Sequence, residues 1–201
     1  MEIKRRTQAE RSAATRAALI EAARRLWSAR GYAAVGTPEI AAEAGVTRGA
    51  MYHQFADKAA LFAEVAEVVE SGVTARLGEY VAASGARDPA AALHAAVDGW
   101  LAACEEPEVR QILLLDGPVV LGWDGFRDMA LRHGLGLTEA MLRAAIEAGQ
   151  LKPQPTLALA HVLIGALDEG AMYLATAADR AAARDEVAAV LHGLLDGMFR
   201  R

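Results

Sequence analysis

The stretch between Thr37 and Lys58 contains residue types that can read a DNA duplex. Its sequence is T-P-E-I-A-A-E-A-G-V-T-R-G-A-M-Y-H-Q-F-A-D-K. Arg48 can donate two hydrogen bonds to O6 and N7 of guanine, and the neighbouring Thr47 can bond a base edge as well. Gly49 and Ala50 have almost no side chain, so a helix that carries them can lie close to the groove floor. We therefore predict base contacts at Thr47, Arg48, Gly49 and Ala50.

Two short helices joined by a tight turn would present these residues. Thr37 is suited to cap the first helix, and Pro38 suits its first turn, where a missing N–H costs nothing. Gly45 can end that helix in a left-handed conformation, and Thr47 can cap the second helix. The residues that would fill the space between the helices are Ile40, Val46 and Met51. The pattern predicts a helix-turn-helix whose exposed face includes Thr47, Arg48, Tyr52 and His53.

Thr37 and Lys58 lie at predicted helix starts, where free backbone N–H groups attract phosphate. We expect both residues to contact the DNA backbone, with a solvated surface charge as the alternative for Lys58. The preceding arm, residues 1–12, carries Lys4, Arg5, Arg6 and Arg11. Contact of this arm with an adjacent groove and plain disorder both stay open.

Helical spacing continues on both sides of this motif. One helix is predicted from about Ala13 to Arg30, with Gly31 as its stop. Asp57 can cap a helix of about 25 residues, which would link the motif mechanically to the rest of the chain. Its apolar stripe is Leu61, Phe62, Val65, Val68, Val69, Val73, Leu77 and Tyr80.

Five further helices are predicted, over residues 88–104, 106–115, 123–148, 156–177 and 180–199. No strand-like alternation appears, so we expect an all-α fold of about nine helices. An N-terminal three-helix DNA-binding domain would cover residues 1–56. A larger α-helical ligand-binding and dimerisation domain would cover residues 57–201.

The charge distribution supports this division. Up to residue 60, ten basic residues face six acidic ones, so this part carries +4 while the whole chain carries −5. A basic module on an acidic body is typical of a DNA-binding protein with a second task. Cys104 is the only cysteine, and the polar start of the chain does not resemble a signal peptide. We expect a cytoplasmic protein with no membrane partner.

The ordered motif resembles the N-terminal domain of the tetracycline-repressor (TetR) family. The matching residues are Arg16, Ala22-Ala23, Leu26-Trp27, Arg30-Gly31-Tyr32, Ile40-Ala41, the run Ala44 to Phe55, and Asp57-Lys58. Trp27 and Gln54 depart from the usual phenylalanine and histidine. Residues 110–118 with Leu121-Gly122-Trp123 look like one C-terminal subgroup of the family. The resemblance implies phosphate contacts at Tyr52 and His53, and packing is the alternative for Tyr52.

The resemblance also implies a homodimeric, ligand-responsive transcriptional regulator, expected to be a repressor of a palindromic operator. Apolar residues on the last two predicted helices are candidates for the dimer interface, with packing inside the subunit as the alternative: Leu163, Leu167, Val187, Val190, Leu191, Leu194 and Met198. Large or soft side chains on the middle helices are candidates to bind a small apolar or aromatic effector: Trp100, Cys104, Leu114, Trp123, Phe126, Met141, His161, Met172 and Tyr173.

Polar residues among these apolar ones, Asp116, Arg127, Asp168 and Glu169, are candidates to orient the effector. Asp168 and Glu169 are also candidates for dimer contacts, and His133 and His192 are expected at the surface. The five histidines show no metal-ligand spacing with Cys104, so neither a metal, a cofactor nor enzymatic activity is predicted. A DNA-binding structural protein without an effector remains the alternative.

Overall fold

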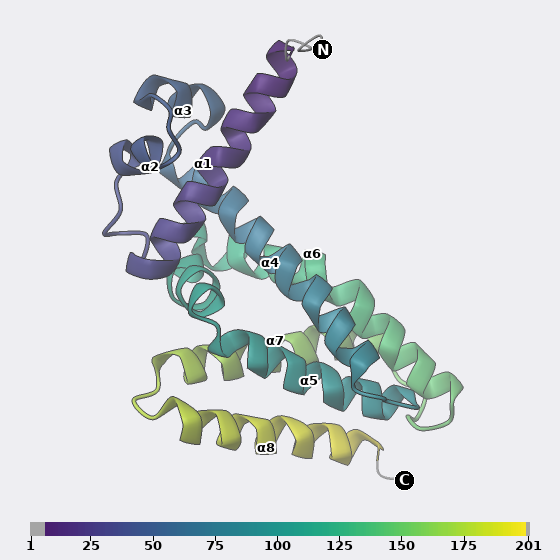
Figure 1. The fold of residues 1–201 in the computed structure, drawn as a ribbon. Helices are drawn as coiled ribbons and strands as arrows, with labels where there is room; N and C mark the ends of the chain where they lie inside the picture. Colours follow the sequence, from purple (N-terminus) through teal and green to yellow (C-terminus); the bar gives the residue numbers. More distant parts are fainter. Residues whose placement is uncertain (1–6, 200–201) are drawn as a thin grey trace.

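A computed structural model describes residues 7–199, and within this range the chain is helical with no β-strand (Figure 1). Eight α-helices and one π-helical segment, η1, follow one another: α1 Gln8–Arg30, α2 Thr37–Glu43, α3 Arg48–Gln54, α4 Lys58–Ala83, α5 Pro89–Glu105, η1 Val109–Asp116, α6 Gly117–Glu147, α7 Thr156–Thr176 and α8 Arg180–Phe199. The predicted all-α class is confirmed.

Helix α1 begins five residues earlier than the predicted start at Ala13. Thr7 and Glu10 form a capping box, in which the Thr7 hydroxyl accepts from the Glu10 N–H (3.2 Å) and Glu10 accepts from the Thr7 N–H (2.7 Å). This pair satisfies two backbone donors that would otherwise lack partners. Arg11 therefore belongs to the helix rather than to an arm, whereas Lys4, Arg5 and Arg6 lie outside the described residues.

Most predicted caps are confirmed, and one is wrong. The side chains of Thr47, Asp57 and Asp88 accept from backbone N–H groups at the starts of α3, α4 and α5. Gly36, however, precedes the first residue of α2, and Thr37 is already helical. With Pro38 in the first turn, the Thr37 side chain is not needed as a cap and turns toward α3 instead.

The predicted break after residue 115 takes a different form in the structure. Residues 109–116 form η1, and α6 follows directly at Gly117. Helix α6 continues to Glu147 through a kink at Gly122, whose φ of 71° and ψ of 164° lie outside the helical range. A positive φ of this kind favours glycine, which explains why the chain can bend there.

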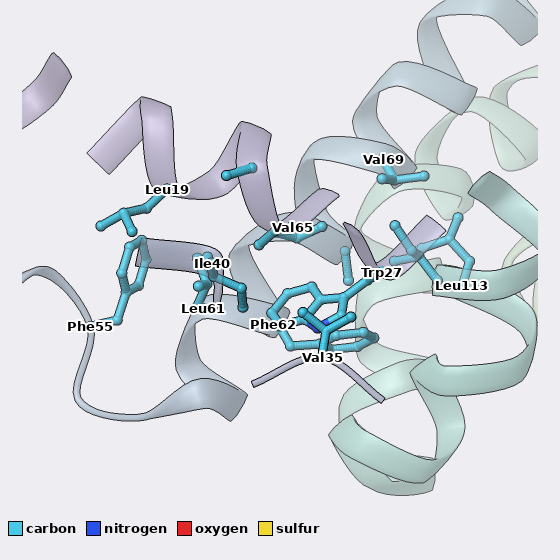
Figure 2. Close-up of a cluster of buried hydrophobic side chains, with 14 of the residues drawn as sticks. Leu19, Trp27, Val35, Ile40, Phe55, Leu61, Phe62, Val65, Val69 and Leu113 are labelled. Atoms are coloured by element: carbon cyan, nitrogen blue, oxygen red, sulfur yellow. The ribbon is translucent and has the colours of Figure 1, made fainter. Parts of the chain in front are cut away.

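Figure 1 shows α4 running from the N-terminal bundle (α1–α3) into the C-terminal body (α5–α8). Its 26 residues correspond to roughly 39 Å at about 1.5 Å per residue. A hydrophobic cluster joins both parts, because Trp27 of α1 and Phe62 of α4 share it with Leu113 of η1 (Figure 2). The bundle therefore contacts the body through η1 as well as through α4.

A second cluster lies inside the body, and α5, α6, α7 and α8 contribute to it. Helix α7 is long and apolar enough to cross a membrane by length and composition alone. Its mid-helix Asp168 is buried and forms an ion pair with Arg127 of α6 at 2.8 Å. One face of α7 thus packs into the core of the body.

Candidate DNA-binding surface and ligand cavity

The outer face of α3 carries most of the predicted DNA-binding residues. Thr47, Arg48, Gly49, Tyr52 and His53 are exposed, and Ala50 is half-buried. On its inner side the helix is anchored by Met51, which is fully buried in the hydrophobic cluster shared with Trp27 and Phe62. The Thr47 hydroxyl also accepts a hydrogen bond from the Ala50 N–H at 3.1 Å. A buried anchor and a cap thus fix a short helix whose free face can enter a groove.

Tyr52 is positioned by two neighbours. Its hydroxyl lies 3.2 Å from the Thr37 hydroxyl, and the Arg48 guanidinium lies over its ring at 5.5 Å from the centroid. The hydrogen bond with Thr37, followed by that with Arg48, lowers the pKa of Tyr52 below its usual value of 10. Thr37 itself is buried, so in this conformation its side chain supports Tyr52 from beneath the surface.

The side chain of Lys58 turns toward the protein. Its Nζ donates to the Tyr32 carbonyl at 2.6 Å and lies 3.8 Å from the centroid of the Tyr32 ring. Burial lowers the pKa of this ammonium group, although the nearby Asp116 opposes the shift. A contact between Lys58 and phosphate would compete with the bond to Tyr32, and it stays a prediction.

Polar contacts join the N-terminal bundle to η1. The Tyr32 N–H donates to Asp116 Oδ2 at 2.8 Å, and Gln111 donates to the same oxygen at 3.1 Å. Gly31 fits closely here, because a Cβ at this position would lie 3.0 Å from the Gln111 amide nitrogen. Its φ of 78° also favours glycine.

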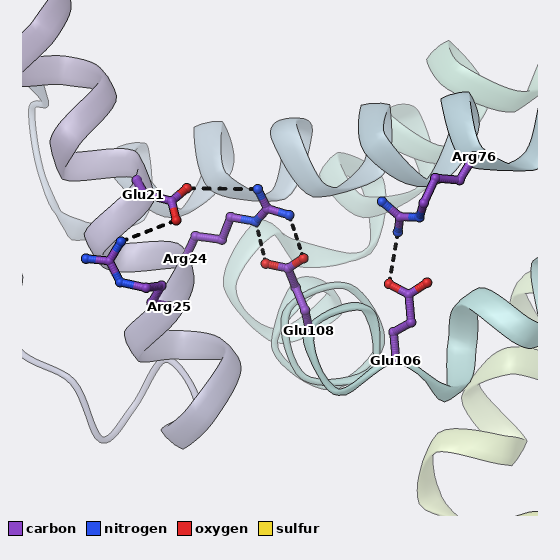
Figure 3. A network of polar contacts seen from close by, with 6 residues as sticks. All are labelled: Glu21, Arg24, Arg25, Arg76, Glu106 and Glu108. Carbon is purple, nitrogen blue, oxygen red and sulfur yellow. Dashed lines mark hydrogen bonds and ion pairs between the residues drawn. The ribbon is translucent and has the colours of Figure 1, made fainter.

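Figure 3 shows a second set of contacts around the start of η1. Arg24 of α1 makes two hydrogen bonds to Glu108, one of them 2.7 Å long. Arg76 of α4 donates to Glu106 at 3.0 Å. Both ends of η1 are therefore tied to the elements that carry the recognition helix. The sequence analysis missed this junction: it treated Asp116-Gly117-Pro118 as a helix break and Asp116 as a candidate to orient the effector, but Asp116 does not line the cavity.

The body contains a cavity of about 100 Å³, walled by α4, α5, α6, α7 and α8. Most of its lining is aliphatic, and the polar residues in the wall are Glu70, Thr74, His133, Thr138 and Asp168. An engineered apolar cavity of ~150 Å³ binds benzene, so a space of this order can accept a small organic molecule.

The nine predicted ligand-binding residues are spread over the body. Trp100 and Met141 line the cavity. Cys104 and Leu114 are buried in the second hydrophobic cluster, and Phe126 is buried in the first. Trp123 and Tyr173 are exposed, Met172 is half-buried, and the His161 carbonyl accepts from Arg127 at 3.0 Å. These last seven do not line the cavity.

The predicted dimer residues divide between the cavity and the surface. Leu163, Leu167, Leu191 and Leu194 all line the cavity. Val187 is buried, and Met198 packs against the second cluster. Val190 is 62% exposed, and α7 adds Val162, which is 66% exposed. The outer face of α7 and α8 therefore carries apolar side chains with no cover in a single chain. Leu157 of α7 and Leu194 of α8 are also exposed, each to 51%.

The polar residues around the cavity are buried to different degrees and paired differently. Arg127 holds Asp168 at 2.8 Å, yet burial raises the pKa of Asp168 to about 6. His133 is only partly exposed and lies 2.7 Å from Glu67, so it is more buried than predicted. Glu70 is 8% exposed, and burial raises its pKa to about 7.

His192 of α8 is also more buried than predicted, because its side chain packs against α5. Its Nε2 lies 2.8 Å from Asp98, and its ring stacks on His94. Cys104 is buried with a raised pKa, mainly through desolvation. Within residues 7–199, no group of three or more His, Cys, Asp or Glu side chains is arranged to hold a metal ion.

Comparisons with known proteins agree with both parts of this geometry. Residues 19–65 match the family model of bacterial regulatory proteins of the tetR family. Residues 90–198 match the model of a tetracyclin repressor-like C-terminal domain. These two ranges contain the recognition helix and most of the cavity wall, respectively.

Two curated relatives and two solved structures are similar to this chain. The HTH-type transcriptional regulator AcrR of Shigella flexneri is 46% identical over 59 residues, which are 29% of this chain and 27% of AcrR. The transposon Tn10 TetC protein of Escherichia coli is 24% identical, with 94% of each chain covered. The structure of RolR in complex with resorcinol has a TM-score of 0.74 at 21% identity, covering 96% of this chain and 97% of RolR.

A TetR-family transcriptional regulator from Pectobacterium atrosepticum gives a TM-score of 0.86 at 32% identity, and the match covers 98% of this chain and 99% of that regulator. This full-length likeness and the two family models agree with the exposed recognition helix and the helical body. The chain therefore belongs to the TetR family of transcriptional regulators, which are non-enzymatic DNA-binding proteins.

Proposed function

We propose that this protein is a ligand-responsive homodimeric repressor that binds a palindromic operator and releases it when a small effector enters the cavity. The observation that carries the proposal is the position of α4. Glu70, Val73, Thr74 and Leu77 of this helix line the cavity, while its first residue, Lys58, bonds to Tyr32 beside the N-terminal bundle. An effector that displaces the cavity wall would therefore move the helix that carries the bundle.

The contacts around η1 support the same route. Asp116 accepts from the Tyr32 backbone, and Glu108 accepts from Arg24. A movement of η1 would therefore move the bundle, as a movement of α4 would. In a dimer, two recognition helices must lie about 34 Å or a multiple of it apart to enter successive major grooves. A small shift of both bundles would remove one of the two half-site contacts.

The apolar outer face of α7 and α8 supports the homodimer. We expect Val190→Glu to break the dimer, because it places a charge where an exposed valine would be buried against a second copy. Analytical ultracentrifugation at micromolar concentration checks this. Ala181→Glu, at an exposed position in the first turn of the same helix, is the matched control. An intact dimer with Val190→Glu would place the interface elsewhere.

A small apolar or aromatic effector is proposed from the cavity lining. RolR, which has the same fold, was solved with the small aromatic molecule resorcinol. The other candidate is a DNA-binding protein without an effector, and the acidic charge of the body does not decide between the two. We further propose a DNA-binding domain of residues 1–56, a ligand-binding and dimerisation domain of residues 57–201, and action in the cytoplasm.

Selection and sequencing of DNA fragments bound by the purified protein, with and without candidate ligands, tests the proposal. We expect a palindromic consensus, and at least one ligand that stabilises the protein to heat and releases this DNA. A consensus without symmetry would contradict the dimeric operator. DNA binding that no cavity ligand changes would favour the protein without an effector.

A further inference from the structure

Glu70 stands apart from the other carboxylates of the body because it is buried in the cavity wall without a partner. It is 8% exposed, and it makes no hydrogen bond or ion pair with any group in residues 7–199. A buried carboxylate of this kind is strongly destabilising unless it is neutralised or paired. The unpartnered group is therefore available to a bound molecule.

The basic groups near Glu70 already have other partners. Arg127 donates to Asp168 at 2.8 Å and to the His161 carbonyl at 3.0 Å. His133, which lines the same cavity, lies 2.7 Å from Glu67 on the outer side of α4. The cavity wall thus holds two carboxylates, Glu70 and Asp168, and only Asp168 has a guanidinium partner.

The rest of the wall can pack against the carbon skeleton of an apolar ligand, which is its apolar frame. Trp100 lines the cavity, and its indole N–H donates to the Leu167 carbonyl at 3.3 Å. The only polar atom of this side chain therefore already has a partner, and a ligand would meet the apolar ring. Leu93, Val97 and Met141 add aliphatic surface and a thioether. An aromatic ring can also attract a cation through its face.

We propose that the effector is a small apolar or aromatic molecule with one basic nitrogen, and that the protonated nitrogen binds the Glu70 carboxylate. The cation supplies the charge that the buried carboxylate lacks, and the apolar frame fills the aliphatic part of the cavity. An anionic ligand would meet repulsion from Glu70 and Asp168. This inference rests on the proposed effector function, and it names the chemical class.

The binding should depend on pH. The groups that face Glu70 are Glu67 on α4, His133 on α6, Asp168 on α7 with Arg127 of α6, and the Cys104 thiol on α5. Burial raises the pKa of Glu70 to about 7 in the empty protein. A cation needs the ionised carboxylate, so its affinity should rise as the pH increases from 6 to 8, while the amine stays protonated.

Three matched sets of probes test the proposal by calorimetry and thermal shift on the full-length protein. They are benzylamine, benzyl alcohol and benzoate; 2-phenylethylamine, 2-phenylethanol and phenylacetate; and cyclohexylmethylamine, cyclohexylmethanol and cyclohexanecarboxylate. On the frame that binds best, we expect the amine to bind at least tenfold more tightly than its alcohol. An alcohol or acid that binds as tightly as its amine, or amines that do not bind, would overturn the proposal.

Glu70→Gln keeps the shape of the side chain and removes the charge. We expect it to abolish the preference for the amine and the rise in amine affinity between pH 6 and pH 8. Glu79→Gln removes one charge from an exposed position of the same helix, outside the cavity, and should keep both. Equal loss in the two variants would assign the preference to overall charge and overturn the role of Glu70.

A DNA-release assay separates this inference from the proposed function. If an alcohol releases the operator equally well from the wild type and from Glu70→Gln, the effector function stands and the amine class is wrong. If amines bind through Glu70 but leave operator binding unchanged, the amine site stands and the effector function is wrong.

Discussion

The recognition helix α3 takes its exposed residues from seven consecutive positions, whereas the cavity takes its walls from five helices between Glu70 and Leu195. The first surface is local, so a short motif in the sequence specifies it. The second forms only when distant helices pack. In this chain the exposed face of the proposed recognition helix can therefore be predicted from neighbours in sequence, and the wall of the cavity cannot.

The two regions also differ in how they hold charge. In the N-terminal bundle the arginines and carboxylates are largely solvated, as in the exposed pair of Arg25 and Glu43 at 2.9 Å. In the body, Glu70 and Asp168 are buried, and their pKa values are raised to about 7 and about 6. Charge in the bundle is therefore mostly in contact with water, whereas the two carboxylates of the cavity wall, Glu70 and Asp168, are largely held out of it.

The largest expected effect comes from Glu70. Its pKa rises on folding from 4.5 to about 7, so the folded protein holds this proton more tightly than the unfolded chain. The contribution of Glu70 to the free energy of unfolding should therefore fall as the pH rises from 4.5 to 7, by roughly 3 kcal/mol at about 1.4 kcal/mol per pH unit. Urea unfolding of the wild type and Glu70→Gln between pH 4.5 and 8 measures this difference.

Glu70→Gln should remove most of that fall, whereas Glu79→Gln should keep it. Parallel curves for the wild type and Glu70→Gln would contradict the burial of an ionisable group in the cavity wall. The contrast between a solvated bundle and a body with buried charge would then be lost.

A substitution of Arg48 tests the exposed face of α3. We expect Arg48→Ala to weaken operator binding by roughly 1–3 kcal/mol and to relax the base preference at one position of each half-site. Fluorescence anisotropy on the selected operator and on single-base variants measures both effects. Arg87→Ala, which changes an exposed arginine of the body outside the junction with η1, is the control. An unchanged base preference would remove Arg48 from direct readout.

Asp116 tests the junction between the two regions. Asp116→Ala leaves the part-buried N–H of Tyr32 without its acceptor, so we expect a loss of about 1–2 kcal/mol in stability. We also expect a weaker effect of ligand on DNA release, because one of the two polar contacts between the η1 region and the bundle is lost while the Arg24–Glu108 contact stays. Asp124→Ala, exposed on α6, is the control. Full ligand response in Asp116→Ala would show that the Asp116 contact has no part in transmission.

The smallest effect is expected from the ion pairs. The side chains of Arg24 and Glu108 are 32% and 22% exposed, whereas those of Arg25 and Glu43 are 52% and 46% exposed. A double-mutant cycle on the first pair should give a coupling of up to about 1 kcal/mol that falls in high salt, and the second pair should give less. Equal coupling energies would mean that partial burial at the junction does not strengthen the Arg24–Glu108 pair beyond an ordinary surface ion pair.

Local chemistry explains which sequence predictions of the fold were confirmed. Thr47 and Asp57 cap the helices they were expected to cap, and Gly45 has the positive φ of 67° that its turn requires. Thr37 failed as a cap because Gly36 already provides the extended residue before α2. The early start of α1 was readable in the Thr7 and Glu10 pair, which the sequence analysis overlooked.

The sequence alone determined the helical class, the family and the residues of the recognition helix, because caps, turns and the face of a single helix depend on near neighbours. Only the tertiary structure decided where the apolar stripes point. Leu163 and Leu191 face a cavity, Val190 faces solvent, and Glu70 lies buried without a partner. Periodicity identifies the apolar side of a helix, but the side chain opposite it belongs to another helix far away in the chain, and only packing brings the two together.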